Sequence, residues 1–204
     1  MAAPHSNNTG SNADEIEVAE LNPATVGAKP DLYMTIRYDA ANGGPGAHRR
    51  FSKSTDEGLS WAPMQDVQVP DPGCKGSVVQ DKAGSNMILS TPASCSGRVN
   101  QTIFLSKDNG VPGSWVYRQF VAAKSGYSTL AMTDEGMIAN LFEEATCQFT
   151  LALVDPKAMI ADGPVSLPLP LTSTHSEDSA ADTNHAVCRT TEWRCPVRRR
   201  SLPD

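Results

Sequence analysis

The sequence contains no apolar run near the roughly 18 residues of a membrane-spanning helix, and its first residues lack the apolar core of a signal peptide. It also lacks an excess of basic residues. The net charge is −6, and the one basic run, residues 198–200, is read as a solvated tail, with a phosphate-binding or targeting patch as the alternative. We therefore expect no membrane span and no nucleic-acid partner.

Apolar residues are scarce at 39%, whereas the chain contains 15 glycines and 15 prolines. Such a composition favours many turns and short strands over long helices, and 204 residues suffice for one domain with a sizeable core. The cysteine count of five is odd, so pairing stays open; Cys74 and Cys95 are one possible pair in a secreted chain. The spacing of His185, Cys188 and Cys195 matches no standard zinc motif, so no metal site is expected there.

A repeat of about fifty residues is the clearest feature that the sequence does contain. Residues 54–61 read S-T-D-E-G-L-S-W and residues 106–110 read S-K-D-N-G, which places Asp56 and Asp108 52 positions apart. Strand-like runs recur around these two segments in a fixed order. First strands are predicted at 15–21, 76–80 and 127–132; second strands at 32–38, 86–91 and 137–143; third strands at 49–54, 99–106 and 148–154; and fourth strands at 66–70 and 115–121.

Four antiparallel strands in a unit of this length are typical of the blades of a β-propeller. We predict an all-β fold, a partial β-propeller of about three four-stranded antiparallel blades, over residues 13–155, with the last blade incomplete. Residues 156–204 lack periodicity and are predicted to form an irregular, flexible tail.

The repeated Asp and Gly residues lie between strand-like runs, where they favour tight hairpins in which the Asp side chain binds turn amides and a Trp packs beneath. We therefore expect a structural role for four residues: Asp56, Trp61, Asp108 and Trp115. Calcium binding is the alternative, although neither segment has the closely spaced oxygen ligands of a calcium loop.

Strand alternation brings five polar residues to one end of the predicted blades. The start of a first strand, the end of a second and the start of a third share one rim, because successive strands run in opposite directions. Glu15 and Tyr127 begin first strands, Arg37 and Glu143 end second strands, and Arg98 precedes a third strand. Each alone could be a solvated charge, a surface ion pair or a packed aromatic. Their convergence around one tyrosine favours a functional site.

At these residues the chain resembles the exo-α-sialidases (neuraminidases) of the Asp-box type, over about residues 13–155 and the second half of the catalytic propeller. The resemblance is carried by the Asp-box at 54–61, G-Y-S-T-L at 126–130, N-L-F-E at 140–143, D-E at 14–15 in place of the family's Asn-Glu, and the segments 72–77 and 96–98. It implies part of a six-bladed β-propeller that hydrolyses terminal α-linked sialic acid. The implied partners are sialylated glycoproteins, gangliosides and oligosaccharides, and no metal or cofactor is required.

The resemblance also implies a role for each of the five residues. Tyr127 is the nucleophile and Glu15 its general base, Arg37 and Arg98 bind the carboxylate of sialic acid, and Glu143 supports the remaining arginine of that set. Glu143 is preferred to its neighbour Glu144 because it directly follows an aromatic residue. A neutral tyrosine avoids repulsion by the substrate carboxylate, but its pKa near 10 demands an adjacent base. Arginines suit the carboxylate because they bind it bidentately and stay charged.

Two parts of the family's site have no candidate in the sequence, namely a further arginine and an Asp that acts as general acid. Because a missing general acid costs about 10²–10⁴ in rate, we expect the chain to be a fragment that is inactive or nearly so alone. The alternatives are a trans-sialidase with the same residues, a non-catalytic Asp-box propeller that binds glycans or protein partners, and a truncated product without function.

Overall fold

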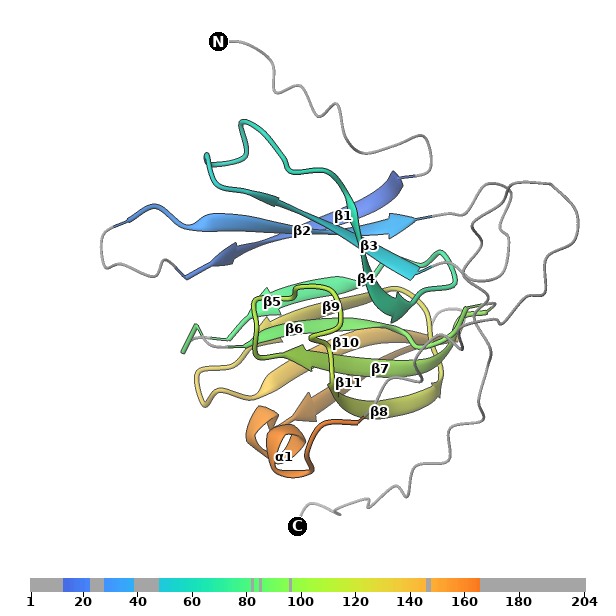
Figure 1. Ribbon diagram of the computed structural model, residues 1–204. Helices are drawn as coiled ribbons and strands as arrows, with labels where there is room; N and C mark the ends of the chain where they lie inside the picture. Colours follow the sequence, from blue (N-terminus) through green and yellow to red (C-terminus); the bar gives the residue numbers. More distant parts are fainter. Residues whose placement is uncertain are drawn as a thin grey trace, which may run out of the picture.

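The computed structural model describes residues 13–22, 28–38, 48–81, 83–84, 86–95, 97–145 and 148–165, and these residues form three antiparallel sheets and one short helix (Figure 1). The first sheet contains β1 (Ala13–Leu21), β2 (Asp31–Tyr38), β3 (His48–Ser54) and β4 (Gln65–Pro70). The second contains β5 (Ser77–Gln80), β6 (Met87–Pro92), β7 (Val99–Ser106) and β8 (Tyr117–Lys124). The third contains β9 (Ser128–Met132), β10 (Ile138–Ala145) and β11 (Gln148–Val154).

This architecture confirms the all-β prediction, including the four-stranded first and second sheets and the shorter third one. Every predicted strand is present, and the largest differences in bounds occur at β8. That strand begins at Tyr117 rather than Trp115 and ends at Lys124. Trp115 instead lies fully buried in the preceding loop, where its indole fills the core beneath the hairpin.

The sheets stack so that their first strands are neighbours, with β1 against β5 and β5 against β9. One core lies between the first and second sheets and includes Tyr33, Phe51, Leu89, Phe104 and Trp115. Another lies between the second and third sheets and includes Ile88, Ile103, Leu105, Ile138 and Met159. The second sheet is thus buried on both faces, which explains why all six residues of β6 are buried rather than alternating.

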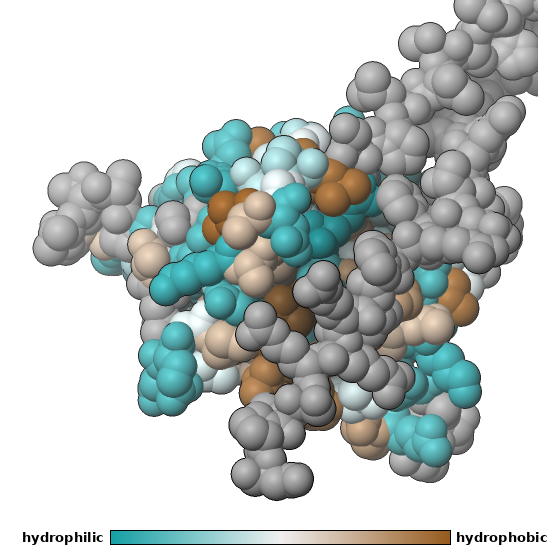
Figure 2. Space-filling view, turned by 90° about the horizontal axis from the view of Figure 1, so that it is seen from below, coloured by the Kyte–Doolittle hydropathy of each residue, from teal (hydrophilic) through white to brown (hydrophobic). Residues whose placement is uncertain are grey.

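The third sheet has one apolar face that the described residues leave open. Phe149, Leu151 and Leu153 alternate along β11 with exposed fractions of 67%, 61% and 59%, and Leu141 of β10 lies opposite Leu151 in the register. Seen from below, the molecule shows several apolar areas among hydrophilic ones at its surface (Figure 2). Since the second sheet covers only the other face, β11 alternates between half-buried and exposed side chains.

Asp56 closes the hairpin between β3 and β4 as the sequence predicts. Its carboxylate accepts hydrogen bonds from the Ser60 amide at 2.8 Å and from the hydroxyls of Ser54 and Ser60 at 2.7 and 2.6 Å. In the equivalent turn after β7, the hydroxyl of Ser106 accepts from the amides of Asp108 and Gly110. Within the described residues no group of three or more His, Cys, Asp or Glu side chains is arranged to hold a metal ion.

Replacing Gly110 with Ala is expected to destabilise the fold by several kcal/mol. Gly110 has a φ of +69°, and an added Cβ would lie 2.8 Å from the Tyr33 ring and 2.9 Å from the Trp115 ring. Left-handed backbone costs a non-glycine residue about 1–2 kcal/mol, and overpacking adds about 1–3 kcal/mol. Gly136 is the matched control, because its φ is +81° but nothing lies within 4 Å of an added Cβ. Urea unfolding should show the larger loss for Gly110→Ala; equal losses would contradict the packing argument.

Two local features differ from the sequence-based expectations. Irregular structure was expected from residue 156, yet α1 (Pro156–Ala161) forms there, because the Asp155 carboxylate caps it through the Lys157 amide and Met159 is buried between the sheets. The pairing of Cys74 with Cys95, which the sequence left open, does not form. Cys74 is a free, buried thiol, whereas Cys95 is disulfide-bonded.

Residues 166–204 of the predicted tail, with His185, Cys188 and Cys195, lie outside the described residues. In the part of the chain that the structure describes, no helix is long and apolar enough to cross a membrane.

Candidate active site

The five residues singled out in the sequence lie at the end of the sheets opposite the Asp56 hairpin. Glu15 is near the start of β1, Arg37 near the end of β2, and Tyr127 directly before β9. Glu143 is near the end of β10 and Arg98 directly before β7. The contacts described below join all five into one cluster.

Glu15 and Arg37 form an ion pair between neighbouring strands. The Arg37 Nη1 atom donates to Glu15 Oε2 at 2.8 Å, and Asp14 Oδ2 lies 3.5 Å from the same nitrogen. The register of β1 against β2 shifts between Ala13 and Ile16, so this pair sits at an irregularity in the sheet. Such bulges commonly re-aim a side chain beside a site. Only 16% of the Arg37 side chain is exposed, so the pair is partly shielded from water.

The Tyr127 side chain lies close enough to the Glu15 carboxylate to lower its pKa through hydrogen bonding, which places the proposed nucleophile beside the proposed base. Partial burial acts to raise the pKa of Glu15, but hydrogen bonds from Arg37 and Tyr127 and the charges of Arg37 and Arg98 hold this pKa below its ordinary value. The carboxylate is therefore ionised and able to receive the proton of a tyrosine hydroxyl.

Arg98 covers the ring of Tyr127, with its guanidinium carbon 4.8 Å from the ring centroid. This distance is typical of a cation–π contact, which is worth about 0.5–2 kcal/mol. A fixed positive charge over the ring also favours any negative charge that develops on the phenolic oxygen. The sequence placed Arg98 on the same rim but gave no sign that it stacks on Tyr127.

Glu143 holds the backbone of Tyr127. Its Oε2 atom accepts from the Tyr127 amide at 3.0 Å, and its own amide donates to the Tyr127 carbonyl at 2.9 Å. A Cβ at Gly126 would lie 2.7 Å from Glu143 Cβ, so glycine is required for this approach. Glu144 instead accepts from the Thr150 hydroxyl of the neighbouring strand. Of the doubled glutamates, Glu143 is therefore the one that contacts the tyrosine.

A buried polar network beneath the tyrosine segment was not predicted from the sequence. Gln101 donates to the Ser90 hydroxyl at 2.6 Å, Ser90 donates to Asn140 Oδ1 at 3.0 Å, and Ser125 donates to Gln101. Gln101, Ser90 and Asn140 are fully buried. Polar residues within otherwise apolar strands were the available signal, but their partners lie on different strands and so cannot be read from spacing.

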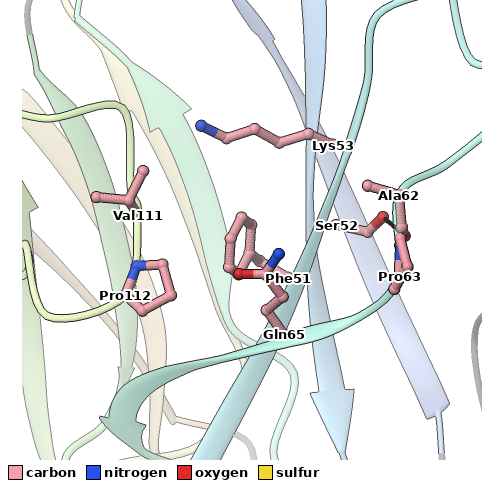
Figure 3. Close-up of a pocket in the computed structure, with 8 residues that line it drawn as sticks. All are labelled: Phe51, Ser52, Lys53, Ala62, Pro63, Gln65, Val111 and Pro112. Carbon is pink, nitrogen blue, oxygen red and sulfur yellow. Dashed lines mark hydrogen bonds between the residues drawn. The ribbon is translucent and has the colours of Figure 1, made fainter.

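A cavity of about 200 Å³ lies at the other end of the first sheet (Figure 3). Its lining comes from the end of β3, the loop between β3 and β4, the start of β4 and the loop after β7. It consists of Phe51, Ser52, Lys53, Ala62, Pro63, Gln65, Val111 and Pro112. Burial lowers the pKa of Lys53, whose amine lies about 6 Å from the Phe51 ring. None of the five clustered residues lines this cavity, so the candidate site rests on the cluster rather than on the cavity.

Replacing Arg37 with Met is expected to raise the pKa of Glu15. The variant removes one of the hydrogen bonds and one of the positive charges that stabilise the carboxylate, while the partial burial remains. Carbon-13 NMR of the side-chain carboxyl during a pH titration measures this directly. Lys53→Met removes a positive charge at the opposite end of the sheet and should leave the titration of Glu15 unchanged. The same Glu15 pKa in Arg37→Met as in the unmodified chain would contradict the ion pair.

Comparison with known proteins supports the resemblance stated above. A sialidase of Bacteroides fragilis is 28% identical over 159 residues, which is 73% of this chain and 27% of that relative. Among solved structures, the Hadza microbial sialidase Hz136 matches with a TM-score of 0.57 and 26% identity, over 72% of this chain and 28% of that one. The intramolecular trans-sialidase of Ruminococcus gnavus, at 20% identity and a TM-score of 0.56, shares the fold over 74% of this chain and 34% of its own. No family model matches.

These likenesses define the class: the chain resembles the sialidases in sequence and in fold. It spans only about a quarter of the length of the sialidase relative that it matches.

Proposed function

We propose that residues 13–155 provide the nucleophile side of a sialidase active site, in which Tyr127 is the nucleophile and Glu15 its general base. The observation that carries the proposal is the cluster itself: Arg37 is bound to Glu15, Arg98 stacks on the Tyr127 ring, and the Tyr127 side chain lies beside the Glu15 carboxylate. A tyrosine paired with a base is one of the recognised solutions for a substrate whose anomeric carbon bears a carboxylate.

In the proposed reaction Glu15 accepts the hydroxyl proton while the Tyr127 oxygen bonds to the anomeric carbon. The bond from that carbon to the leaving-group oxygen breaks, and its electron pair stays with the oxygen. Arg98 stabilises the tyrosine oxygen as it becomes negative, since the guanidinium lies over the ring. Water then attacks the same carbon, and Tyr127 departs and recovers its proton from Glu15. The proton lost by the water passes through solvent to the leaving-group oxygen, and free sialic acid results.

Arg37 has two roles in this scheme. Without substrate it is bound to Glu15 and holds the pKa of that carboxyl low, which makes Glu15 a weak base. A substrate carboxylate competes for the same guanidinium, because arginine binds carboxylates preferentially through paired N–H donors. Arg37 would then release Glu15, and its basicity would rise when substrate is present.

The proposed substrates are glycoproteins, gangliosides and oligosaccharides that end in an α-linked sialic acid. A complete sialidase site also requires a general acid, and the sequence offers no candidate for it. In natural sialosides the leaving group is a poorly stabilised alkoxide, so cleavage needs that acid. In aryl sialosides the leaving group is a stable phenolate, so cleavage needs the acid much less.

The test is cleavage of a fluorogenic aryl sialoside by the full 204-residue chain, with cooperative unfolding as proof that the chain is folded. We expect slow cleavage of the aryl sialoside and, at the same enzyme concentration, cleavage of sialyllactose lower by about 10²–10⁴. Binding of a dehydrated sialic acid analogue without any cleavage would favour a non-catalytic glycan-binding propeller. A folded chain that neither binds the analogue nor cleaves the sialoside would overturn the proposal.

A further inference from the structure

A short chain of polar contacts links the first strands of all three sheets. The Leu130 amide of β9 donates to the Ser77 hydroxyl of β5 at 2.8 Å, and that hydroxyl donates to Glu17 Oε1 of β1 at 2.9 Å. Lys75 Nζ lies 3.7 Å from Glu17 Oε2 and 3.5 Å from the Ser128 carbonyl oxygen. We refer to Glu17, Lys75 and Ser77 as the clasp.

Both ends of the clasp lie close to the Glu15–Tyr127 contact along the chain. Glu15 and Glu17 share one side of β1, because both are half-buried while the residues on either side of each are exposed, and they are about 7 Å apart along the strand. Ser128 directly follows Tyr127, and Leu130 is three residues on. The clasp therefore joins the strand that carries the base to the strand that follows the nucleophile.

Because the clasp is largely buried, loss of one of its hydrogen bonds would cost folding free energy. Ser77 is fully buried. Among the described strands β9 pairs only with β10, and the Leu130 amide points to Ser77, away from that strand. A buried amide without a partner costs about 1–3 kcal/mol. Glu17 Oε2 is likewise shielded from solvent, with the Lys75 charge nearby. The lowest-energy arrangement of β1 relative to β9 is thus one that keeps these contacts.

We propose that Glu17, Lys75 and Ser77 are positioning residues that set the separation between the Glu15 carboxylate and the Tyr127 hydroxyl. They act through the two strands and do not touch the reacting atoms. That this separation matters for catalysis rests on the proposed function. The clasp and its effect on the pKa of Glu15 can be measured without any catalytic turnover.

Ser77→Ala in the full chain tests the clasp through the carboxyl titration of Glu15. Loss of the Ser77 bridge should let β9 move from β1 and weaken the Tyr127–Glu15 hydrogen bond, so the pKa of Glu15 rises toward its ordinary value while the Arg37 ion pair remains. Ser106→Ala is the matched control, since it removes an equally buried hydroxyl at the opposite end of the sheets, where it accepts from Asp108 and Gly110. It should leave the Glu15 titration unchanged.

The pair Lys75→Met and Lys75→Arg provides a second test if Ser77→Ala does not fold. The quantity measured is the NMR chemical shift of the Arg98 side-chain N–H groups, which the ring current of Tyr127 displaces. This shift reports the position of the Tyr127 ring relative to Arg98 and not the loss of the Lys75 charge. We expect this shift to change in Lys75→Met and to be restored in Lys75→Arg. An unchanged Glu15 titration in folded Ser77→Ala, or identical Arg98 shifts in both lysine variants, would overturn the proposal. Because both readouts are independent of turnover, absence of sialoside cleavage bears on the proposed function and not on the clasp.

Discussion

Tyr127→Phe is expected to lower aryl sialoside cleavage by at least about 10³-fold, since loss of a nucleophile typically removes most of an enzyme's rate enhancement. The variant deletes one oxygen, which is the atom that would bond to the anomeric carbon. Phenylalanine keeps the ring beneath Arg98 and the backbone bonds to Glu143, so the fold and the two arginines should be retained. Binding of a sialic acid analogue should therefore change by less than about tenfold, while turnover falls.

Tyr38→Phe is the matched control for this prediction. Tyr38 also lies at the end of a strand on the same rim, and it also carries an arginine over its ring, with Arg50 at 4.8 Å from the centroid. It lies one residue beyond Arg37, so its hydroxyl is lost from the same region without loss of the proposed nucleophile. Retained turnover in Tyr127→Phe, or an equal loss in Tyr38→Phe, would remove Tyr127 from the role of nucleophile.

The strands and the position of the site residues on one rim could be predicted because both follow from the repeat. Tight turns at Asp56 and Asp108 fix a repeat, and within a repeat antiparallel strands alternate in direction. Any residue at the start of a first strand, such as Glu15, then shares a rim with a residue at the end of a second strand, such as Arg37. This placement depends only on the order of the elements, and the observed Glu15–Arg37 contact agrees with it.

The contacts within the site depend on side-chain directions between sheets, which no spacing along the chain encodes. The stacking of Arg98 on Tyr127 and the bridge from Ser77 to Leu130 each join segments of different sheets. The contact of Glu143 could likewise be predicted only in part. Its place on the rim follows from strand alternation, but its bond to the Tyr127 amide depends on the close approach that Gly126 permits. Helix α1 escaped prediction because six residues are too few to display a helical period.

Arg49→Met is expected to destabilise the fold by about 3–5 kcal/mol, the usual cost of removing one partner from a buried ion pair. Arg49 on β3 and Asp71 in the link between the first two sheets have side-chain exposures of only 1% and 0%, with Nε and Oδ2 3.1 Å apart. Asp71 also accepts from the amides of Gly73 and Cys74 and so fixes that link. Arg50→Met is the control, because the Arg50–Asp66 pair is about 30% exposed and should cost no more than about 1 kcal/mol.

The charge left on Asp71, rather than the lost side-chain volume, should cause most of this loss. Burial raises the pKa of Asp71 and the charge of Arg49 opposes that effect, so the pKa should rise further in Arg49→Met. A group whose pKa is raised in the folded state favours folding when it is protonated. The difference in unfolding free energy between Arg49→Met and the unmodified chain should therefore become smaller from neutral to mildly acidic pH, as measured by urea unfolding.

The double variant Arg49→Met/Asp71→Asn should recover most of the lost stability at neutral pH, since an amide oxygen can still accept from Gly73 and Cys74 without a charge. If the difference in unfolding free energy stays constant with pH, and the double variant is no more stable than Arg49→Met, the lost stability comes from packing instead.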